Sequence, residues 1–221
     1  MAKAEGTREK LLDSAARLFA ERGIDGVSLR EIGQAAGQLN TGAARYHFGS
    51  KIGLVDAVFE HRMVAINERR VRMLDQITAD GASADLRRLV EAFLVPLSTA
   101  LGDPGRETWY LRFAVQAGHL DGSAPTRTAD QPWTSGMDRL GSLVPDALDD
   151  VPVPLRAQRW WMTQSHVGHA LADRERQLRH AARHALLPRD VFLSAVTDTA
   201  VALISAPLSA ATRELWEGAH P

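Results

Sequence analysis

One stretch near the N-terminus holds two short helical patterns on either side of a glycine, and this pairing limits the folds open to the chain. Ser28 and Glu31 have the spacing of a capping box, in which a hydroxyl and a carboxylate each bond a backbone N–H at a helix start. Gly37 is suited to end that helix, because glycine readily adopts the left-handed conformation that follows many helices. A second helix can begin at Asn40 or Thr41, which are both good N-caps. Two helices joined by a short glycine-containing turn are typical of a helix-turn-helix, although the spacing alone fits an ordinary helical hairpin equally well.

Helical periodicity continues along the rest of the chain, and no stretch alternates Val, Ile and Thr in the manner of a strand. Beyond the hairpin, helices are expected at about residues 7–23, 51–78, 84–101, 106–119, 133–143, 155–187 and 191–206. Residues 1–6 are expected to form a flexible arm, and 121–132 a loop. The sequence therefore predicts an all-α fold, with an N-terminal three-helix bundle at 1–50 and a larger helical domain at 51–221. The helix over 51–78 would connect the two.

The composition is that of a globular protein, with 45% hydrophobic and 24% charged residues in a chain of 221. No apolar run approaches the length of a membrane span and the N-terminus has no signal-peptide core, so a cytoplasmic protein without membrane contact is expected. The absence of cysteine excludes disulfides, thiolate metal sites and cysteine nucleophiles. The net charge of −1 gives no general attraction to nucleic acid, so DNA binding would depend on the placement of a few basic groups.

The first quarter of the chain carries three motifs in order. They are TREKLLDSAARLFAERG at Thr7–Gly23, an AAG break at Ala35–Gly37, and YHFGSK at Tyr46–Lys51. This order resembles the DNA-binding domain of the TetR family of bacterial transcriptional repressors. The resemblance implies a homodimer that binds a palindromic double-stranded DNA operator and is released by a small molecule in a C-terminal ligand-binding and dimerisation domain. The sequence departs from the common family pattern by one additional residue in the turn 37–41 and by arginine at Arg45.

The second helix of the hairpin is the candidate recognition helix, whose first residues would meet base edges in the major groove. Arg45 is the side chain on this helix that can make a bidentate contact with guanine. A phosphate contact, which positions the protein without reading sequence, is the alternative for Arg45. Gly42, Ala43 and Ala44 are small, and we expect them to let the backbone approach the groove closely.

The family resemblance assigns roles to the residues that follow. It makes Tyr46, His47 and Lys51 contacts to phosphates, and it makes Phe48 part of the bundle core. Hydroxyl and guanidinium groups near the start of the first hairpin helix are further phosphate candidates. The complete set of predicted DNA-binding residues is Ser28, Arg30, Asn40, Thr41, Gly42, Ala43, Arg45, Tyr46, His47 and Lys51.

Large apolar side chains recur in the C-terminal part, and the chain holds five tryptophans. At helical spacing such residues usually form core. In proteins that this chain resembles, however, the corresponding helices surround a small-molecule cavity, so a mostly apolar effector pocket with a few polar points is predicted. The predicted pocket residues are Trp109, Phe113, Gln116, Trp133, Met137, Trp160, Trp161 and Gln164.

The last two long helices each carry a flank that suits a partner helix, with small residues that allow close packing. On the first of these helices the flank comprises Gln164, Val167, Gly168, Leu171, Glu175, Leu178 and Ala182. On the second it comprises Ala195, Thr199, Ala202 and Ala206. The family resemblance implies a dimer through a four-helix bundle, built from the helices at about 155–187 and 191–206 of each subunit.

Other functions have weaker support in the sequence. His166 and His169, and likewise His180 and His184, share a helix face, but neither pair has the glutamate or cysteine neighbours of a zinc site, so no metal is predicted. The chain has no G-x-S-x-G, P-loop or Rossmann motif, so no enzyme, catalytic residue or cofactor is predicted. Two alternatives stay open: a small-molecule sensor or carrier that acts through a protein partner, and a transcriptional activator with the same DNA-binding domain.

Overall fold

The computed structural model describes residues 2–40, 42–104, 107–118, 131–179 and 186–219. Helices account for most of these residues and no strand occurs among them, which confirms the predicted all-α fold class. The helical elements are α1 (Ala2–Arg22), α2 (Leu29–Ala35), α3 (Ala43–Phe48), α4 (Lys51–Ala79), α5 (Leu86–Ser98), α6 (Tyr110–Gly118), the 3-10 helix η1 (Pro132–Thr134), α8 (Ser135–Asp146), α9 (Val153–Arg179), α10 (Arg189–Ser205) and α11 (Ala210–Ala219).

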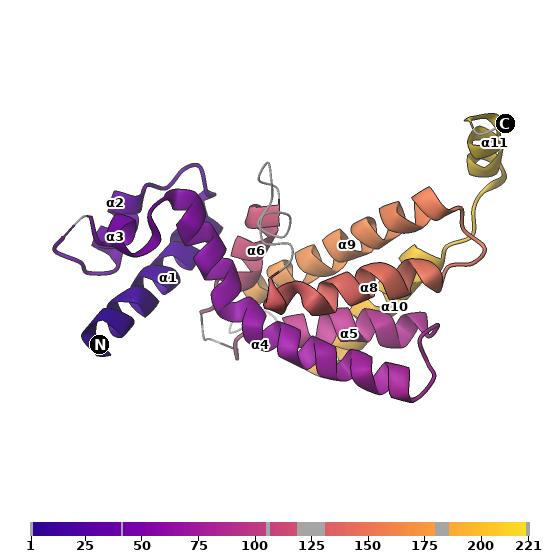
Figure 1. Ribbon diagram of the computed structural model, residues 1–221, viewed down its shortest axis with the longest axis horizontal. Helices are drawn as coiled ribbons and strands as arrows, with labels where there is room; N and C mark the ends of the chain where they lie inside the picture. Colours follow the sequence, from indigo (N-terminus) through magenta and orange to yellow (C-terminus); the bar gives the residue numbers. More distant parts are fainter. Residues whose placement is uncertain (1, 41, 105–106, 119–130, 180–185, 220–221) are drawn as a thin grey trace.

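The helices form two groups that α4 connects. α1, α2 and α3 lie together at one end of an elongated molecule, and α5, α8, α9 and α10 pack side by side in the other part (Figure 1). α4 contacts α1 and α3 as well as α5 and α8. α6 packs against both α1 and α9, so it bridges the two groups. A change in the second group can therefore reach the first through either α4 or α6.

The N-terminal group encloses a small apolar core. Phe19 of α1 and Ile32 of α2 are fully buried there, and Leu18 is nearly so. Leu29 and Phe48 are half-buried and pack against this core. Their helical spacing places these residues on the inward faces of the three helices, and Phe48 takes the core position that the family resemblance implied.

The turn between α1 and α2 is held by the side chain of Glu31. Ser28 donates from its backbone N–H and from its hydroxyl to Glu31 Oε2, at 2.8 and 2.7 Å, and Glu31 N donates back to Ser28 Oγ at 3.2 Å. Arg22, at the end of α1, donates to Glu31 Oε1 at 2.7 Å. The bonds from Ser28, and then that from Arg22, lower the pKa of Glu31 to about 2, so the carboxylate is charged at neutral pH. The predicted capping box is confirmed.

α6 is capped by a side chain from a distant helix. The backbone N–H groups of Leu111 and Arg112 donate to the carboxylate of Glu175 on α9, at 3.2 and 3.1 Å. Arg112 Nε donates to the same carboxylate at 3.2 Å. Glu175 is only 1% exposed. The first turn of α6 is thus fixed to α9 by one buried carboxylate, which satisfies N–H groups that have no partner within the helix.

Two helices differ in length from the prediction. α1 begins at Ala2, so residues 2–6 continue the helix and do not form the predicted flexible arm. α9 ends at Arg179 in the described residues, and 180–185 lie outside them. Leu187 is not helical, because the residue before a proline is pushed out of the helical conformation.

The segment before α9 also differs. α6 begins at Tyr110, while the predicted start at Arg106 and most of the predicted loop 121–132 lie outside the described residues. The helix predicted over 133–143 continues to Asp146.

Most of the predicted dimer flank of α9 faces the core of its own chain, so that part of the prediction is wrong; Gln164 and Gly168 are half-buried, and Ala182 lies outside the described residues. Val167, Leu171 and Leu178 are buried there, and Glu175 caps α6. The side chains belong to the packed interior because α9 is covered by α6, α8 and α10. The predicted flank of α10 is exposed and comprises Ala195, Thr199, Ala202 and Ala206.

α11 extends away from the packed helices and buries none of its residues (Figure 1). No single helix among the described residues is long and apolar enough to cross a lipid bilayer. The consecutive helices α10 and α11, bent by 47°, reach that length and composition only as a pair.

Candidate nucleic-acid interface

α3 has one face in the bundle and one face in solvent. Ala44 is fully buried and Ala43 is only 9% exposed, whereas Gly42, Arg45 and Tyr46 are exposed. The two alanines allow α3 to pack closely against α2 and α4, which it contacts. The Ala43 methyl group points into the core, so any approach of Ala43 to the groove would be made by its backbone, as the small side chain led us to expect. The exposed face of α3 begins at Gly42 and continues with Arg45 and Tyr46.

The turn before α3 is shaped by Asn40. Its Oδ1 accepts a hydrogen bond from Gly42 N at 2.9 Å, and α3 then begins at Ala43 with Gly42 as its N-cap. Asn40 is thus not the N-cap, but this bond uses its acceptor and leaves its NH₂ group for other contacts. Thr41 lies outside the described residues. Local side-chain bonds of this kind are common for Asn in turns.

Leu39 is a candidate contact that the sequence did not single out. Its side chain is fully exposed at the tip of the turn between α2 and α3. An apolar side chain at such a position can contact the methyl group of thymine in the major groove. The additional residue in the turn was the signal that could have drawn attention to it.

Arg30 and Ser28 lie at the start of α2 and differ in what they can offer. Arg30 is exposed. The Ser28 hydroxyl already donates to Glu31 at 2.7 Å and accepts from Glu31 N at 3.2 Å. With the capping box intact, its proton is used, so Arg30 is the better phosphate ligand of the two.

The aromatic side chains that end α3 lie beside one another. Tyr46 is 86% exposed, and its ring meets the half-buried ring of His47 edge-on, with centroids 5.4 Å apart. Both side chains carry polar groups that suit phosphate oxygens. Phe48 packs on the core, and the guanidinium carbon of Arg8 lies 5.6 Å from its ring centroid.

The Lys51 side chain bonds to the protein's own backbone and does not point into solvent, as a phosphate contact would require. Its ammonium donates to the backbone carbonyls of Ile24, Asp25 and Val27, at 3.1, 3.3 and 3.2 Å. An ammonium has three N–H groups, so all its donors are used in this arrangement. Lys51 therefore ties the start of α4 to the turn between α1 and α2, and so helps to fix how α3 is presented.

We expect Lys51→Met to lower the free energy of unfolding by about 1–3 kcal/mol, because charge-assisted bonds to three carbonyls are lost. A lysine that contacts phosphate would give a different result. Its loss would lower the slope of log K against log salt concentration for DNA binding by about 0.9. Thermal melts and salt titrations of DNA binding distinguish the two roles. Lys10→Met, on the exposed surface of α1, makes the same change in net charge and serves as the control. Unchanged stability with a reduced slope would contradict the structural role.

Residues 11–58 match the family described as bacterial regulatory proteins, tetR family. This N-terminal segment belongs to the TetR family. The match begins within α1, contains α2 and α3, and ends within α4. The helices that TetR-family membership assigns to DNA binding are thus those with the exposed Arg45 and Tyr46. Relatives that share this segment are named as transcriptional regulators or repressors.

Three similar TetR-family proteins differ in how much of the chain they match. The HTH-type transcriptional repressor KstR2 of Rhodococcus jostii (strain RHA1) is 49% identical over 53 residues, which cover 24% of this chain and 26% of that protein. The HTH-type transcriptional regulator AcrR of Shigella flexneri is 41% identical over 81 residues, 37% of each chain. The HTH-type transcriptional regulator BetI of Burkholderia mallei (strain NCTC 10229) is 31% identical over 116 residues, 51% of this chain and 55% of BetI. The chain thus spans from about a quarter to about half of the length of these relatives.

The predicted effector residues have unlike surroundings. Phe113, Trp133 and Trp160 are buried, whereas Gln116 and Trp161 are exposed. The Trp133 ring packs on Phe59 with centroids 5.7 Å apart, and the Trp160 ring meets Phe93 edge-on at 5.3 Å. Half-buried positions are taken by Trp109, Met137 and Gln164. The buried members are packed against other aromatic side chains, Phe113 against Phe19 of α1 and the two tryptophans within the second group of helices.

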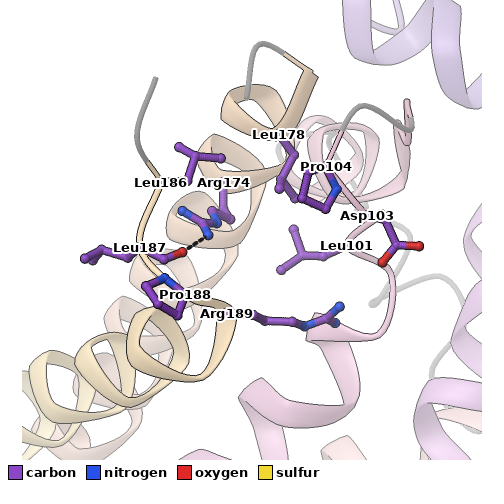
Figure 2. A pocket seen from close by; sticks show the side chains of 10 residues that line it. Leu101, Asp103, Pro104, Arg174, Leu178, Leu186, Leu187, Pro188 and Arg189 are labelled. Atoms are coloured by element: carbon purple, nitrogen blue, oxygen red, sulfur yellow. Dashed lines mark hydrogen bonds between the residues drawn. The ribbon is translucent and has the colours of Figure 1, made fainter. Parts of the chain in front are cut away.

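Two pockets are lined mainly by other residues. One, of about 480 Å³, lies between the end of α9 and the segments that follow α5 and precede α10, and Figure 2 shows Leu101, Leu178 and Arg174 around it. Its two guanidinium groups are already bonded to backbone carbonyls, Arg174 to that of Leu187 and Arg189 to that of Ser98. The other pocket, of about 530 Å³, lies where α1 meets α4 and the segment before α6. Of the predicted effector residues, Trp109 alone lines one of these two pockets.

Trp109 is held between two arginines. The guanidinium carbons of Arg112 and Arg179 lie 4.4 and 4.2 Å from its ring centroid. These cation–π contacts join α6 to the end of α9.

The histidine pairs have ordinary partners where the structure describes them. His166 Nε2 lies 2.9 Å from Thr199 Oγ1, and His169 Nδ1 donates to the carbonyl of Ser165 at 2.8 Å. His180 and His184 lie outside the described residues. Within the part of the chain that is described, no three His, Asp or Glu side chains are grouped as a metal site would require.

Proposed function

We propose that the chain is a transcriptional repressor that binds a palindromic operator as a homodimer and leaves it when a small molecule binds the C-terminal domain. The observation that carries the proposal is the capped α2–turn–α3 unit, with Arg45 and Tyr46 on the exposed face of α3, in a segment that belongs to the TetR family. Two relatives are named as transcriptional repressors, which supports repression and not activation as the proposed effect on transcription.

We divide the proposed roles at the start of α4. Residues 1–50 would read the operator, and 51–221 would hold the effector and the partner subunit. The exposed flank of α10 and the neighbouring large side chains of α9 support dimerisation through these helices. Trp161 and Met162 of α9 are 60% and 45% exposed, and these two adjacent apolar side chains form a patch that a partner helix could cover. A twofold dimer would place its two α3 helices in major grooves about 34–36 Å apart.

The contacts of α6 support a route from effector to DNA. Phe113 of α6 stacks on Phe19 of α1 with centroids 5.9 Å apart, and the start of α6 is fixed to α9 by Glu175. A ligand that favours another position of α6 would shift α1, and with it the spacing of the two α3 helices. The effect on DNA affinity can be no larger than the difference in the ligand's affinity for the two states.

Arg45→Ala tests the proposal at the point where the sequence of the DNA would be read. We expect operator affinity to fall about 5- to 150-fold, the equivalent of about 1–3 kcal/mol for a lost bidentate contact to guanine. The preference at one base pair in each half-site should be relaxed. Fluorescence anisotropy with DNA from upstream of the protein's own coding sequence, and with singly substituted variants of it, measures both effects.

Arg72→Ala on the exposed surface of α4 is the matched control and should bind as the wild type does. Equal weakening of Arg45→Ala on every DNA sequence would make Arg45 a phosphate contact. No sequence-specific binding by the wild type at physiological salt would contradict the proposed function and favour a sensor that acts through a protein partner.

A further inference from the structure

Arg70 on α4 is a cation in the core of the second group of helices, and no described residue supplies a counter-charge to it. Its side chain is 0% exposed. Nε and Nη2 have no hydrogen-bond partner among the described residues, and Nη1 has only the sulfur of Met63, at 3.9 Å. A thioether is a weak acceptor, so the guanidinium is essentially unsatisfied.

The groups around Arg70 are aromatic and neutral. The guanidinium carbon lies 5.6 Å from the ring centroid of Phe93 on α5. Tyr110 on α6 is close enough to interact electrostatically, but its hydroxyl donates to the carbonyl of Phe59 at 3.2 Å. Burial raises the pKa of Tyr110 far above its usual range, so the phenol is not a phenolate counter-ion. Burial also lowers the pKa of Arg70 to about 10, which leaves the guanidinium charged at neutral pH.

The start of α8 fixes the Arg70 side chain in this place. Asn67 Oδ1 accepts from Gly136 N at 2.9 Å, and Asn67 Nδ2 donates to Ser135 Oγ at 3.2 Å. These two bonds join Asn67 to the start of α8 and do not involve Arg70. A Cβ at Gly136 would lie 2.9 Å from Arg70 Cδ, so only glycine allows this close approach. Close packing against Gly136 thus fixes the orientation of the Arg70 side chain.

A buried ion without a partner opposes folding by several kcal/mol in general, and an apolar side chain of similar length would fill the same space without that penalty. The two unsatisfied groups also have a useful geometry. Nε–H and Nη2–H form one edge of the planar guanidinium, and this edge matches the two oxygens of a carboxylate. The feature that weakens the ligand-free protein is therefore well suited to an anionic ligand.

We propose that Arg70 binds the carboxylate of the effector through this edge, and that the effector is a small organic acid with an apolar, aromatic-compatible body. The inference rests on the proposed function, since it names the chemical class of that effector. Phe93 and Tyr110 would contact the body next to the carboxylate, with Trp160 packed on Phe93 behind them. Both nitrogens are enclosed, so binding requires the surrounding side chains to move. Because Arg70 lies on α4, this movement acts on the helix that carries the DNA-binding end.

The test measures melting temperatures by circular dichroism with benzoate, phenylacetate and indole-3-acetate, each compared with its neutral amide. We expect at least one carboxylate to raise the melting temperature of the wild type by about 3 °C or more at millimolar concentration, and its amide to have no such effect. In Arg70→Met the carboxylate shift should disappear. Without ligand, Arg70→Met should melt at or above the temperature of the wild type, since an unpaired buried ion has been removed.

Two further variants complete the design. Arg69→Met, at the exposed neighbouring position of α4, removes the same charge and should keep the full carboxylate shift. Arg70→Lys keeps the charge but lacks the two-nitrogen edge, so it should keep only part of the shift.

Three results would overturn the inference: equal shifts with carboxylate and amide, no shift with any of the acids in the wild type, or an Arg70→Met variant that melts well below the wild type or does not fold. The last would make Arg70 a structural residue. Sequence-specific DNA binding by the ligand-free wild type tests the proposed function separately. A protein that binds its operator but shows no Arg70-dependent shift would contradict this inference alone.

Discussion

Replacing Glu175 with alanine is expected to lower the free energy of unfolding by about 3–5 kcal/mol, the usual effect of removing one partner of a buried ion pair. The carboxylate accepts from the backbone N–H groups of Leu111 and Arg112 and from Arg112 Nε, and its side chain is entirely buried. Without it, a guanidinium and two N–H groups at the start of α6 lose their acceptor in a place that water reaches poorly. Urea denaturation followed by circular dichroism measures the change.

Asp173→Ala is the matched control on the same helix. Asp173 pairs with Arg176 on the exposed surface, and such pairs contribute less than about 1 kcal/mol. If Glu175→Ala lowers stability no more than Asp173→Ala does, α6 does not depend on the cap from α9. The proposed route through α6 would then lack its fixed point.

Phe113→Ala is expected to lower the free energy of unfolding by about 3–5 kcal/mol and to separate the unfolding of the two groups of helices. The ring is fully buried and stacks on Phe19 of α1, so its removal leaves a cavity where α6 meets the DNA-binding end. All five tryptophans lie at or beyond Trp109, so their fluorescence reports on the second group, whereas circular dichroism reports on all helices. The two signals should coincide for the wild type and differ for Phe113→Ala.

Gln116→Ala, on the exposed surface of the same helix, should change stability by less than about 0.5 kcal/mol. Coincident transitions in Phe113→Ala would contradict the idea that this contact joins the two groups. A large loss of stability in Gln116→Ala would instead point to α6 itself, and not to its contact with α1.

Local features of the DNA-binding end could be predicted well. The capping box of Ser28 and Glu31 is as expected, because it joins groups three positions apart in the chain, and Ser50 caps α4 over the same spacing. Gly37 adopts a positive φ of 69°, as the helix end requires. The predicted α3 was less accurate, since the contact of Asn40 with Gly42 delays its start.

The candidate sites depended on contacts that no local pattern contains. Arg45 and Tyr46 are on the exposed face as predicted, but Ala43 is in the core because α2 and α4 cover it. Lys51 reaches carbonyls 24 to 27 positions earlier in the chain. Trp160 and Trp161 were both predicted to line an effector pocket, yet on α9 Trp160 is buried and Trp161 is exposed.

The sequence by itself determined the helices, their caps and the family, because periodicity and capping act within a few residues of the chain. Only the tertiary structure decided what those helices enclose. Glu175 was predicted as part of a dimer flank. In the structure it accepts a hydrogen bond from Leu111 N, which lies 64 residues away in the chain. Arg70 is one of several arginines along α4, and only packing removes it from water and leaves its Nε and Nη2 without a hydrogen-bond partner among the described residues. Burial depends on which distant segments meet, and that is set by the whole fold.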